Sequence, residues 1–308
     1  MIIYKHDDCL LKDNGSHHPE RKERIESILK SIKQIKDYEI IFKDAPLADL
    51  ETISLVHPKK HIEQIFSNIP KSGLIGVEKE PFADTMLCPD SKKAILRSCG
   101  AGIAATNELM IKNERVFCAI RPPGHHAETT KAMGFCFINN IAVAARVLQN
   151  KYEVNKIAII DFDVHHGNGT QEIFYNDETV LYASSHEFPL FPGTGSEQET
   201  GVGNIFNVPL KTGLKGKEFV KIFDQKILKP IDAFKPEVIL ISAGFDAHVR
   251  DPLANINLES EDFYTITKQI VDVANVHSGG RVISFLEGGY DLLALSESIK
   301  QHLSALKN

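Results

Sequence analysis

The chain has 308 residues, of which 43% are hydrophobic and 25% are charged, as in an ordinary globular protein. Its formal net charge of -6 gives it no general attraction for nucleic acid, so a dedicated DNA- or RNA-binding protein is disfavoured. The sequence shows neither a signal-peptide pattern nor the roughly 20 consecutive apolar residues that cross a bilayer, so we expect a cytoplasmic protein with no membrane partner.

The elements that the sequence predicts alternate between helices and strands. A lysine-rich helix over residues 20–36 comes first and is most simply a solvated surface helix. The strands are short, β-branched runs of nearly continuous hydrophobicity, which is typical of strands buried on both faces of a parallel sheet. These runs are residues 116–120, 156–160, 180–183, 238–242 and 281–286.

Helical patterns lie between most of these strands. Residues 139–149 and 217–228 have apolar side chains spaced by three and four positions, which is typical of amphipathic helices. The Pro- and Gly-containing segment 187–203 is expected to be a long loop, and loops of that length are often functional. The alternation predicts one α/β domain over residues 1–308, with helices covering a parallel sheet.

The five cysteines are odd in number and none is part of a Cys-x-x-Cys pair. This pattern indicates neither a disulfide framework nor a thiolate zinc site. We therefore expect reduced thiols, as in cytosolic proteins.

Polar residues follow four of the predicted strands directly. Because open α/β sheets bind ligands outside the carboxyl ends of their strands, these four strand exits predict one convergent site. The four segments are RPPGHH at 121–126, DFDVHHGNG at 161–169, AGFDAH at 243–248 and EGGYD at 287–291.

The second of these segments carries the clearest metal pattern. In extended backbone Asp161, Asp163 and His165 share one face, where two carboxylates and an imidazole are costly unless they are paired or bind a metal. With Asp246 from another strand exit, Asp163 and His165 form the three-ligand set of a catalytic zinc site. The ligand types also suit ferrous iron or cobalt, and a self-satisfied polar cluster is the plainer alternative.

The paired histidines and the tyrosine are weaker signals. One of two adjacent histidines is usually structural, but the Pro-Pro-Gly turn places His125 and His126 where a proton-transfer group would reach water activated by a metal. Tyr290 follows two glycines, which we expect to make the backbone mobile enough to aim its hydroxyl as a hydrogen-bond donor to a developing oxyanion.

Six motifs, in order, resemble the zinc-dependent histone-deacetylase and acetylpolyamine-amidohydrolase superfamily, and the resemblance spans roughly residues 17 to 305. HHGNGT and the upstream His18-Pro-Glu are more similar to the class II branch and its bacterial relatives than to class I. The resemblance implies the arginase-deacetylase fold, a mainly parallel sheet of about eight strands with helices on both faces. The motifs are RPPGHHAE, GFCFINN, DFDVHHGNGTQ, FPGTG, SAGFDAH with DPL, and EGGYD.

The resemblance also implies the chemistry. It assigns zinc to Asp163, His165 and Asp246, and it makes His126 the general base and acid. In class I relatives an aspartate orients this histidine, whereas the present chain has Asn168. We expect a neutral partner to leave His126 less basic, as suits a group that accepts a proton near neutral pH.

Other positions receive supporting roles from the resemblance. His125 is the electrostatic partner of His126 and is oriented by Asp161, while Tyr290 donates to the oxyanion. Phe135 and Phe191 are the aromatic walls of a tunnel for the lysine methylenes. Gly134 leaves room beside them, and Leu253 lies at the tunnel mouth. A structural potassium ion is implied as well, held by Asp161, Asp163, His165, Ser184 and Ser185.

Three alternatives to a lysine deacetylase stay open. An arginase-type ureohydrolase shares the fold, but Gly167 and His248 stand where its second metal requires carboxylates. An acetylpolyamine amidohydrolase is disfavoured because Leu253 replaces a gatekeeper glutamate. A catalytically silent acyl-lysine-binding scaffold would bind metal without turnover. The expected partner is acetylated lysine in a peptide or protein, including histone tails, while the oligomeric state is left undetermined.

Overall fold

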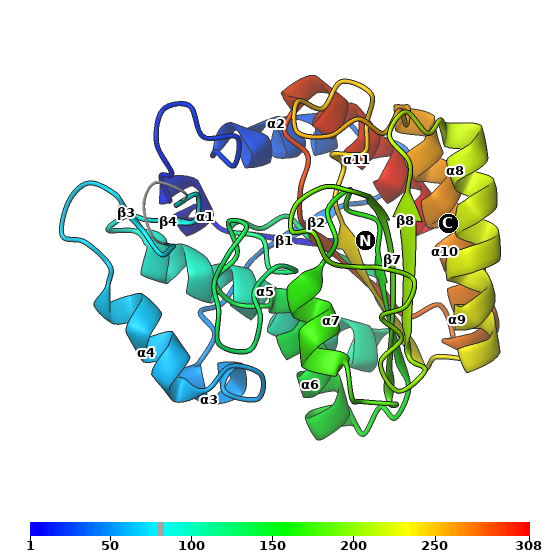
Figure 1. Ribbon diagram of the computed structural model, residues 1–308, viewed down its shortest axis with the longest axis horizontal. Helices are drawn as coiled ribbons and strands as arrows, with labels where there is room; N and C mark the ends of the chain where they lie inside the picture. Colours follow the sequence, from blue (N-terminus) through cyan, green and yellow to red (C-terminus); the bar gives the residue numbers. More distant parts are fainter. Residues whose placement is uncertain (79–82) are drawn as a thin grey trace.

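The structure, a computed structural model, describes residues 1–78 and 83–308 and is built around an eight-stranded sheet (Figure 1). The strand order is β2-β1-β5-β10-β9-β6-β7-β8, and every neighbouring pair is parallel. The strands are β1 Ile2–Lys5, β2 Ile41–Asp44, β5 Val116–Cys118, β6 Ile157–Asp161, β7 Val180–Glu187, β8 Ile205–Leu210, β9 Val238–Ala243 and β10 Val282–Leu286. A separate antiparallel pair consists of β3 Ile75–Gly76 and β4 Met86–Leu87.

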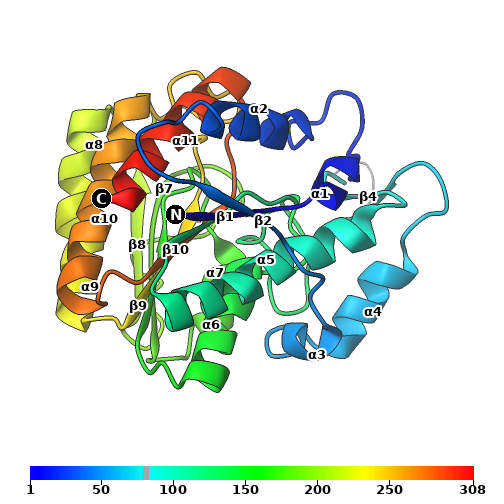
Figure 2. The same cartoon turned by 180° about the vertical axis from the view of Figure 1, so that it is seen from behind.

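Helices cover both faces of the sheet. One face packs against α2, α8 to α11 and a π-helical segment η1, while the other packs against α3, α4, α5, α6 and α7. Helices α2 and α11 lie side by side, although they come from opposite ends of the chain (Figures 1 and 2). The helices are α1 Asp8–Leu11, α2 Glu23–Ile32, α3 Leu50–Ile53, α4 Lys59–Ser67, α5 Ser91–Lys112, α6 Asn140–Tyr152, α7 Asn168–Phe174, α8 Gly216–Ile222, η1 Phe223–Leu228, α9 Lys229–Phe234, α10 Ser260–His277 and α11 Leu292–Lys307.

The predicted α/β fold is confirmed, and the reason lies in the strand composition. All residues of β6, β9 and β10 are buried, as their uninterrupted apolar runs require between two helical layers. The five predicted strands correspond to β5, β6, β7, β9 and β10. Strands β1, β2 and β8 had not been singled out; β2 is an exposed edge strand, so it lacks the apolar run that marked the others.

The predicted helices also form, with shifted ends. Helix α2 covers 23–32 instead of 20–36, and the pattern over 217–228 is divided between α8 and η1. The expected loop 187–203 occupies the connection from β7 to β8. Among the described residues, no helix combines the length and hydrophobicity that crossing a membrane would take. All five cysteines are buried and free.

Strand order decides where polar segments meet. The chain passes from β5 to β6, although β10 and β9 lie between these two strands in the sheet. In this region, the connections that follow neighbouring strands therefore leave toward opposite faces of the sheet. Such a switch point opens a crevice at the carboxyl edge of a parallel sheet. The register aligns the ends of these strands, because Asp161 is opposite Ser242 and Ala243 is opposite Leu286. The four polar segments predicted to converge therefore start at one edge.

Candidate metal and catalytic site

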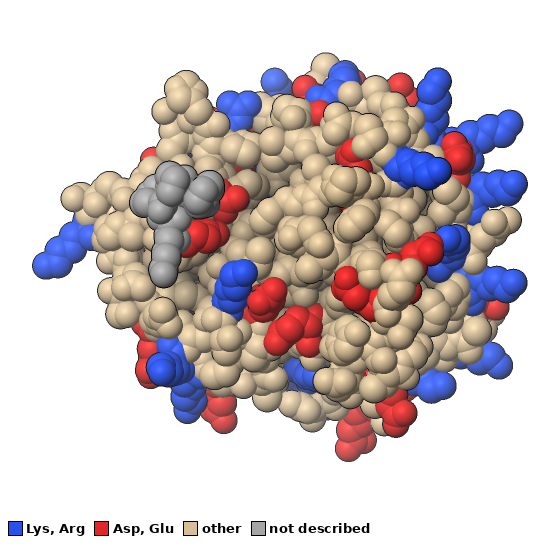
Figure 3. Space-filling view, viewed as in Figure 1, with Lys and Arg blue, Asp and Glu red and all other residues tan. Residues whose placement is uncertain are grey.

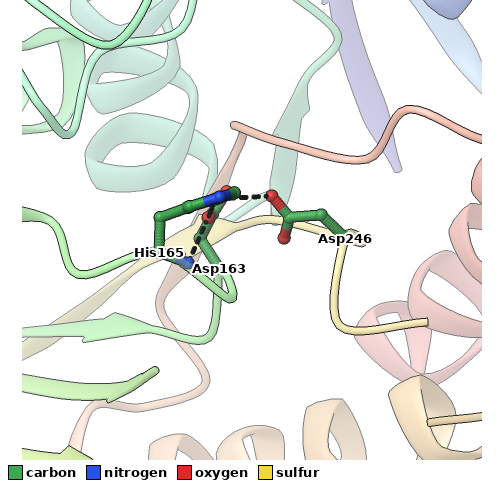
Figure 4. A group of neighbouring side chains, drawn as sticks. All are labelled: Asp163, His165 and Asp246. Carbon is green, nitrogen blue, oxygen red and sulfur yellow. Dashed lines mark hydrogen bonds and ion pairs between the residues drawn. The ribbon is translucent and has the colours of Figure 1, made fainter. Parts of the chain in front are cut away.

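Asp163, His165 and Asp246 converge just beyond the ends of β6 and β9 (Figure 4). The Nδ1 atom of His165 lies 3.1 Å from Oδ1 of Asp163 and 3.1 Å from Oδ2 of Asp246. The other carboxylate oxygens are held by backbone: the amide of Gly288 donates to Asp163 Oδ2 at 2.7 Å, and that of Val164 donates to Asp246 Oδ1 at 3.0 Å. Both carboxylates are buried, so their orientation is fixed by the fold.

These donors fit a zinc ion. Ligand atoms bound to tetrahedral zinc at about 2.0–2.2 Å are separated by roughly 3.3–3.5 Å, close to the spacing that His165 shows to each carboxylate. Two carboxylates also balance the charge of a divalent ion. Without such an ion, two buried carboxylates would lack a compensating charge, which is costly. Among the described residues, these three form the group of side chains able to share one ion.

The two predicted catalytic histidines, His125 and His126, lie side by side next to the metal-ligand group, and their ring centroids are 4.0 Å apart. Nδ1 of His125 is 3.0 Å from Oδ2 of Asp161, and Nδ1 of His126 is 2.9 Å from Oδ1 of Asn168. Both partners accept, so each histidine carries its proton on Nδ1 and leaves Nε2 as the acceptor when neutral. The structure thus pairs each histidine with the residue that the resemblance had assigned to it.

The two imidazoles have opposite electrostatic surroundings. Burial opposes charge on His125, but the carboxylates of Asp161 and Asp163 outweigh burial and raise its pKa to about 10. Burial, together with the neighbouring rings of His125 and His165, holds the pKa of His126 well below its usual value. The pair therefore combines a cation with a neutral proton acceptor at neutral pH.

Tyr290 is buried beside the same site. Its pKa is raised well above the ordinary value by burial, so its hydroxyl stays protonated and is a donor. The guanidinium of Arg24 lies 4.9 Å from the ring centroid, and the Tyr290 amide donates to Asp251 at 2.7 Å. A Cβ at Gly288, in the preceding glycine pair, would lie 2.1 Å from Asp246 Oδ2, so glycine is also required there for space.

The predicted tunnel residues flank the histidines and the tyrosine. The ring of Phe191 is 5.1 Å from His126, and the ring of Phe135 is 6.1 Å from Tyr290. Gly134 has a φ of +56°, and a Cβ there would lie 2.5 Å from Cδ2 of His126. This glycine therefore permits the close approach of the backbone to the imidazole, a role other than the room beside the phenylalanines that the resemblance had implied.

Leu253, predicted to lie at the tunnel mouth, is linked to Tyr290 through Asp251. Its amide donates to Oδ1 of Asp251 at 3.0 Å, while Oδ2 of Asp251 receives the amide of Tyr290 at 2.7 Å. One buried carboxylate therefore holds Leu253 and Tyr290 together. Position 253 therefore carries an apolar side chain and not a carboxylate.

Two of the residues assigned to potassium, Asp163 and His165, also belong to the metal-ligand group, and the others lie on β6 and β7. Asp161 on β6 is paired in register with Ser184 on β7. The buried hydroxyl of Ser185 has no hydrogen-bond partner within residues 1–78 and 83–308. A buried oxygen of this kind fits the donor set of an oxygen-coordinated cation.

Three charged side chains that support the site had been given no role in the sequence analysis. Glu287 Oε2 accepts from the amides of Gly124 at 2.7 Å and His125 at 3.2 Å, which fixes the turn carrying the histidines. The fully buried Arg121 forms a two-point ion pair with Glu20, at 2.6 and 2.9 Å. Glu287 directly follows a strand, and that placement could have marked it; nothing local links Glu20 to Arg121, because 101 residues separate them.

The positions that argued against a second metal have other functions. His248 receives the amide of Arg250 at 3.1 Å and lies 3.3 Å from the hydroxyl of Ser260. A Cβ at Gly167 would lie 2.3 Å from Oδ2 of Asp161, so no larger residue fits beside that carboxylate. The arginase-type alternative therefore lacks its ligands.

The charge distribution on one face is uneven. In the space-filling view, lysine and arginine side chains gather along the right-hand edge, over α8 to α10, whereas the upper centre of this face is largely uncharged and acidic side chains lie just below it (Figure 3). A general basic surface is thus absent from the centre of the visible face.

Comparisons with known proteins found deacetylases and a deacetylase domain. Residues 18–306 match the family model described as histone deacetylase domain. The chain is 38% identical over 306 residues to rice "Histone deacetylase 10, chloroplastic", covering 93% of this chain and 69% of the relative. It is 35% identical over 297 residues to a "Probable deacetylase" of Archaeoglobus fulgidus, covering 94% and 81%. The solved HDA15 HD domain superposes with a TM-score of 0.92 at 30% identity, covering 100% of this chain and 91% of that one.

Proposed function

The chain belongs to the histone deacetylase family, and we propose that it is a zinc-dependent deacetylase that hydrolyses N6-acetyl-lysine in peptides or proteins, histone tails among them. Residues 1–308 would act as one catalytic domain. The observation that carries the proposal is the convergence of a His/Asp/Asp donor set, a neutral imidazole and a protonated phenol at one edge of the sheet. Side chains of these types supply what amide hydrolysis by activated water requires.

The metal ligands would be Asp163, His165 and Asp246. When bound there, zinc supplies a Lewis acid that polarises the acyl carbonyl and lowers the pKa of water. The potassium ion implied by the family would be held by the set that includes Ser184 and Ser185, where it would brace the strand ends that carry the ligands.

The histidines would move and balance protons. Nε2 of His126 faces the site as an acceptor, because its Nδ1 donates to Asn168, and it would take a proton from the attacking water. The cationic His125, held by Asp161, would offset the negative charge that develops. His126 would then give its proton to the departing lysine amine, which leaves acetate and a free amine as products.

Tyr290 would stabilise the charge that forms on the acyl oxygen, because its hydroxyl remains protonated at neutral pH. Phe135 and Phe191 would hold the methylenes of the substrate between their rings. Leu253 adds no negative charge at the rim that would select a second amine, which favours acetyl-lysine over acetylpolyamines.

The test is release of free amine from a fluorogenic acetyl-lysine peptide, with and without a chelator or a hydroxamate, beside acetylputrescine. We expect chelator-sensitive turnover of the peptide. His126→Ala and Tyr290→Phe should each lose most of it while binding zinc as tightly as the parent. Cleavage of acetylputrescine alone would refute the lysine assignment. Zinc binding without turnover of either substrate would refute an acetyl-specific enzyme and leave a longer acyl group or a silent binder.

A further inference from the structure

The carboxylate of Glu128 lies directly behind Asn168, on the side away from His126. Nδ2 of Asn168 donates to Oε1 of Glu128 at 2.7 Å, while Oδ1 of Asn168 lies 2.9 Å from Nδ1 of His126. The three side chains therefore form one hydrogen-bonded series that ends at the proposed proton acceptor. The mechanism proposed above gives Glu128 no part.

An asparagine amide presents either its oxygen or its nitrogen to a neighbour, so its position alone does not decide which atom His126 meets. A carboxylate only accepts hydrogen bonds. Glu128 therefore selects Nδ2 of Asn168 and leaves Oδ1 for His126. The flipped amide would set two oxygens against each other at the distance now spanned by the 2.7 Å bond. The flipped amide would also place the proton of a neutral His126 on Nε2. This nitrogen could then no longer accept a proton from water.

The other contacts of Asn168 bias its amide much less. Nδ2 also approaches Sδ of Met133 at 3.4 Å and the carbonyl oxygen of His126 at 3.5 Å. A thioether sulfur is a weak acceptor, and 3.5 Å is at the limit of a hydrogen bond. Glu128 is itself held by a tight turn, because its amide donates to the carbonyl of Lys131 at 3.0 Å.

We propose that Glu128 is a positioning residue that fixes the tautomer of His126 by orienting the Asn168 amide. Its importance for turnover rests on the proposed function, but the tautomer is a property of the folded chain and can be measured without substrate. A carboxylate that orients a neutral amide gives the histidine a defined tautomer without placing a charge in contact with it.

Substitutions at Glu128 that change its donor and acceptor character test the proposal. Glu128→Lys presents only donors, so the amide should flip, the proton should move to Nε2, and kcat/KM should fall by at least about 100-fold, as a wrong tautomer does in other histidine-dependent hydrolases. Glu128→Gln allows both orientations, so a mixture of tautomers and a loss of roughly two- to tenfold are expected. The tautomer is read from the ¹⁵N shifts of the His126 ring, assigned by their loss in His126→Ala.

Glu172 provides the matched control. It lies on α7, where its Oε2 accepts from the amide and hydroxyl of Thr129 at 2.9 and 2.7 Å, in the loop that also contains Glu128. Glu172→Lys makes the same change of charge nearby, and it should leave the His126 tautomer unchanged and the rate within about threefold of the parent.

A second background separates orientation from loop damage. Aspartate at position 168 only accepts, so in Asn168→Asp the tautomer no longer depends on residue 128. Adding Asn168→Asp to Glu128→Lys should therefore restore the Nδ1 proton and raise kcat/KM above that of Glu128→Lys alone. Unchanged ¹⁵N shifts in Glu128→Lys would overturn the proposal. A parent with the Nδ1 proton but no turnover would refute the proposed function and leave this inference standing.

Discussion

Replacing Gly134 with alanine tests whether the imidazole of His126 must sit where the structure places it. The added Cβ would lie 2.5 Å from Cδ2 of His126, so the two must separate by about 0.9 Å to reach an ordinary contact of 3.4 Å. A displacement of this size would strain the 2.9 Å hydrogen bond to Asn168. Because misplacing a catalytic group by about 1 Å can cost on the order of 100-fold in rate, we expect kcat/KM to fall by about that factor.

Backbone strain has to be separated from this effect. Gly134 has a φ of +56°, and alanine in the left-handed region costs about 1–2 kcal/mol wherever it stands. Gly213 is the matched control, since its φ is +84° and nothing lies within 4 Å of a Cβ built on it. Both variants should lower Tm by a few degrees, about 2–4 °C per kcal/mol, but only Gly134→Ala should lose activity.

The assay is steady-state hydrolysis of an acetyl-lysine peptide by the zinc-loaded parent and both variants, with Tm measured in the same buffer. A Gly134→Ala rate within threefold of the parent would refute the steric argument. Equal losses of activity in Gly134→Ala and Gly213→Ala would show that backbone strain, and not contact with His126, is responsible.

Three further outcomes are expected. Burial lowers the pKa of His302 to about 3, below the value of about 6.5 in the unfolded chain, so the stability conferred by the neutral ring is present above pH 7 and is lost as pH falls. This loss reaches about 2 kcal/mol at pH 5, so His302→Gln should reduce the fall in unfolding free energy between pH 7 and 5 by about that amount, the rest being due to other buried histidines such as His57 and His186; a parent-like slope would contradict the assignment. Glu20→Gln leaves the charge of Arg121 buried without its partner and should cost about 3–5 kcal/mol in denaturant unfolding, whereas the exposed Glu26→Gln should change stability by less than about 0.5 kcal/mol; similar values for the two would show that the ion pair is not required. Zinc at 100 times its Kd should stabilise the parent by about 2.7 kcal/mol, and Asp246→Asn should abolish most of that gain; an undiminished shift would place the ion elsewhere.

Much of the fold could be predicted because the signals are local. Buried parallel strands are nearly uniform in hydrophobicity, and this marked β5, β6, β7, β9 and β10. Short or edge strands such as β1 and β2 carry too few apolar residues to stand out from the loops around them. Helix ends shifted by several residues because capping and packing, which the pattern does not contain, decide where the last turn stops.

The candidate site divides in the same way. Asp163 and His165 are neighbours in sequence, and their alternation on extended backbone already placed them on one face. The arrival of Asp246 and Tyr290 at the same place depends on a register that aligns separate strand ends. The sequence indicated that convergence only through the general behaviour of parallel sheets.

By itself, then, the sequence determined which chemical groups the chain carries and that they leave buried strands at one edge of a parallel sheet. Tertiary structure alone decided which groups support them. Glu20 meets Arg121 across 101 residues, and Glu128 meets Asn168 across 40. Gly288 leaves the space that the carboxylate of Asp246 occupies, a requirement that its sequence context does not contain. The physical reason is that hydrogen bonds and excluded volume act over a few ångströms, and only the folded chain brings residues so distant in sequence within that range.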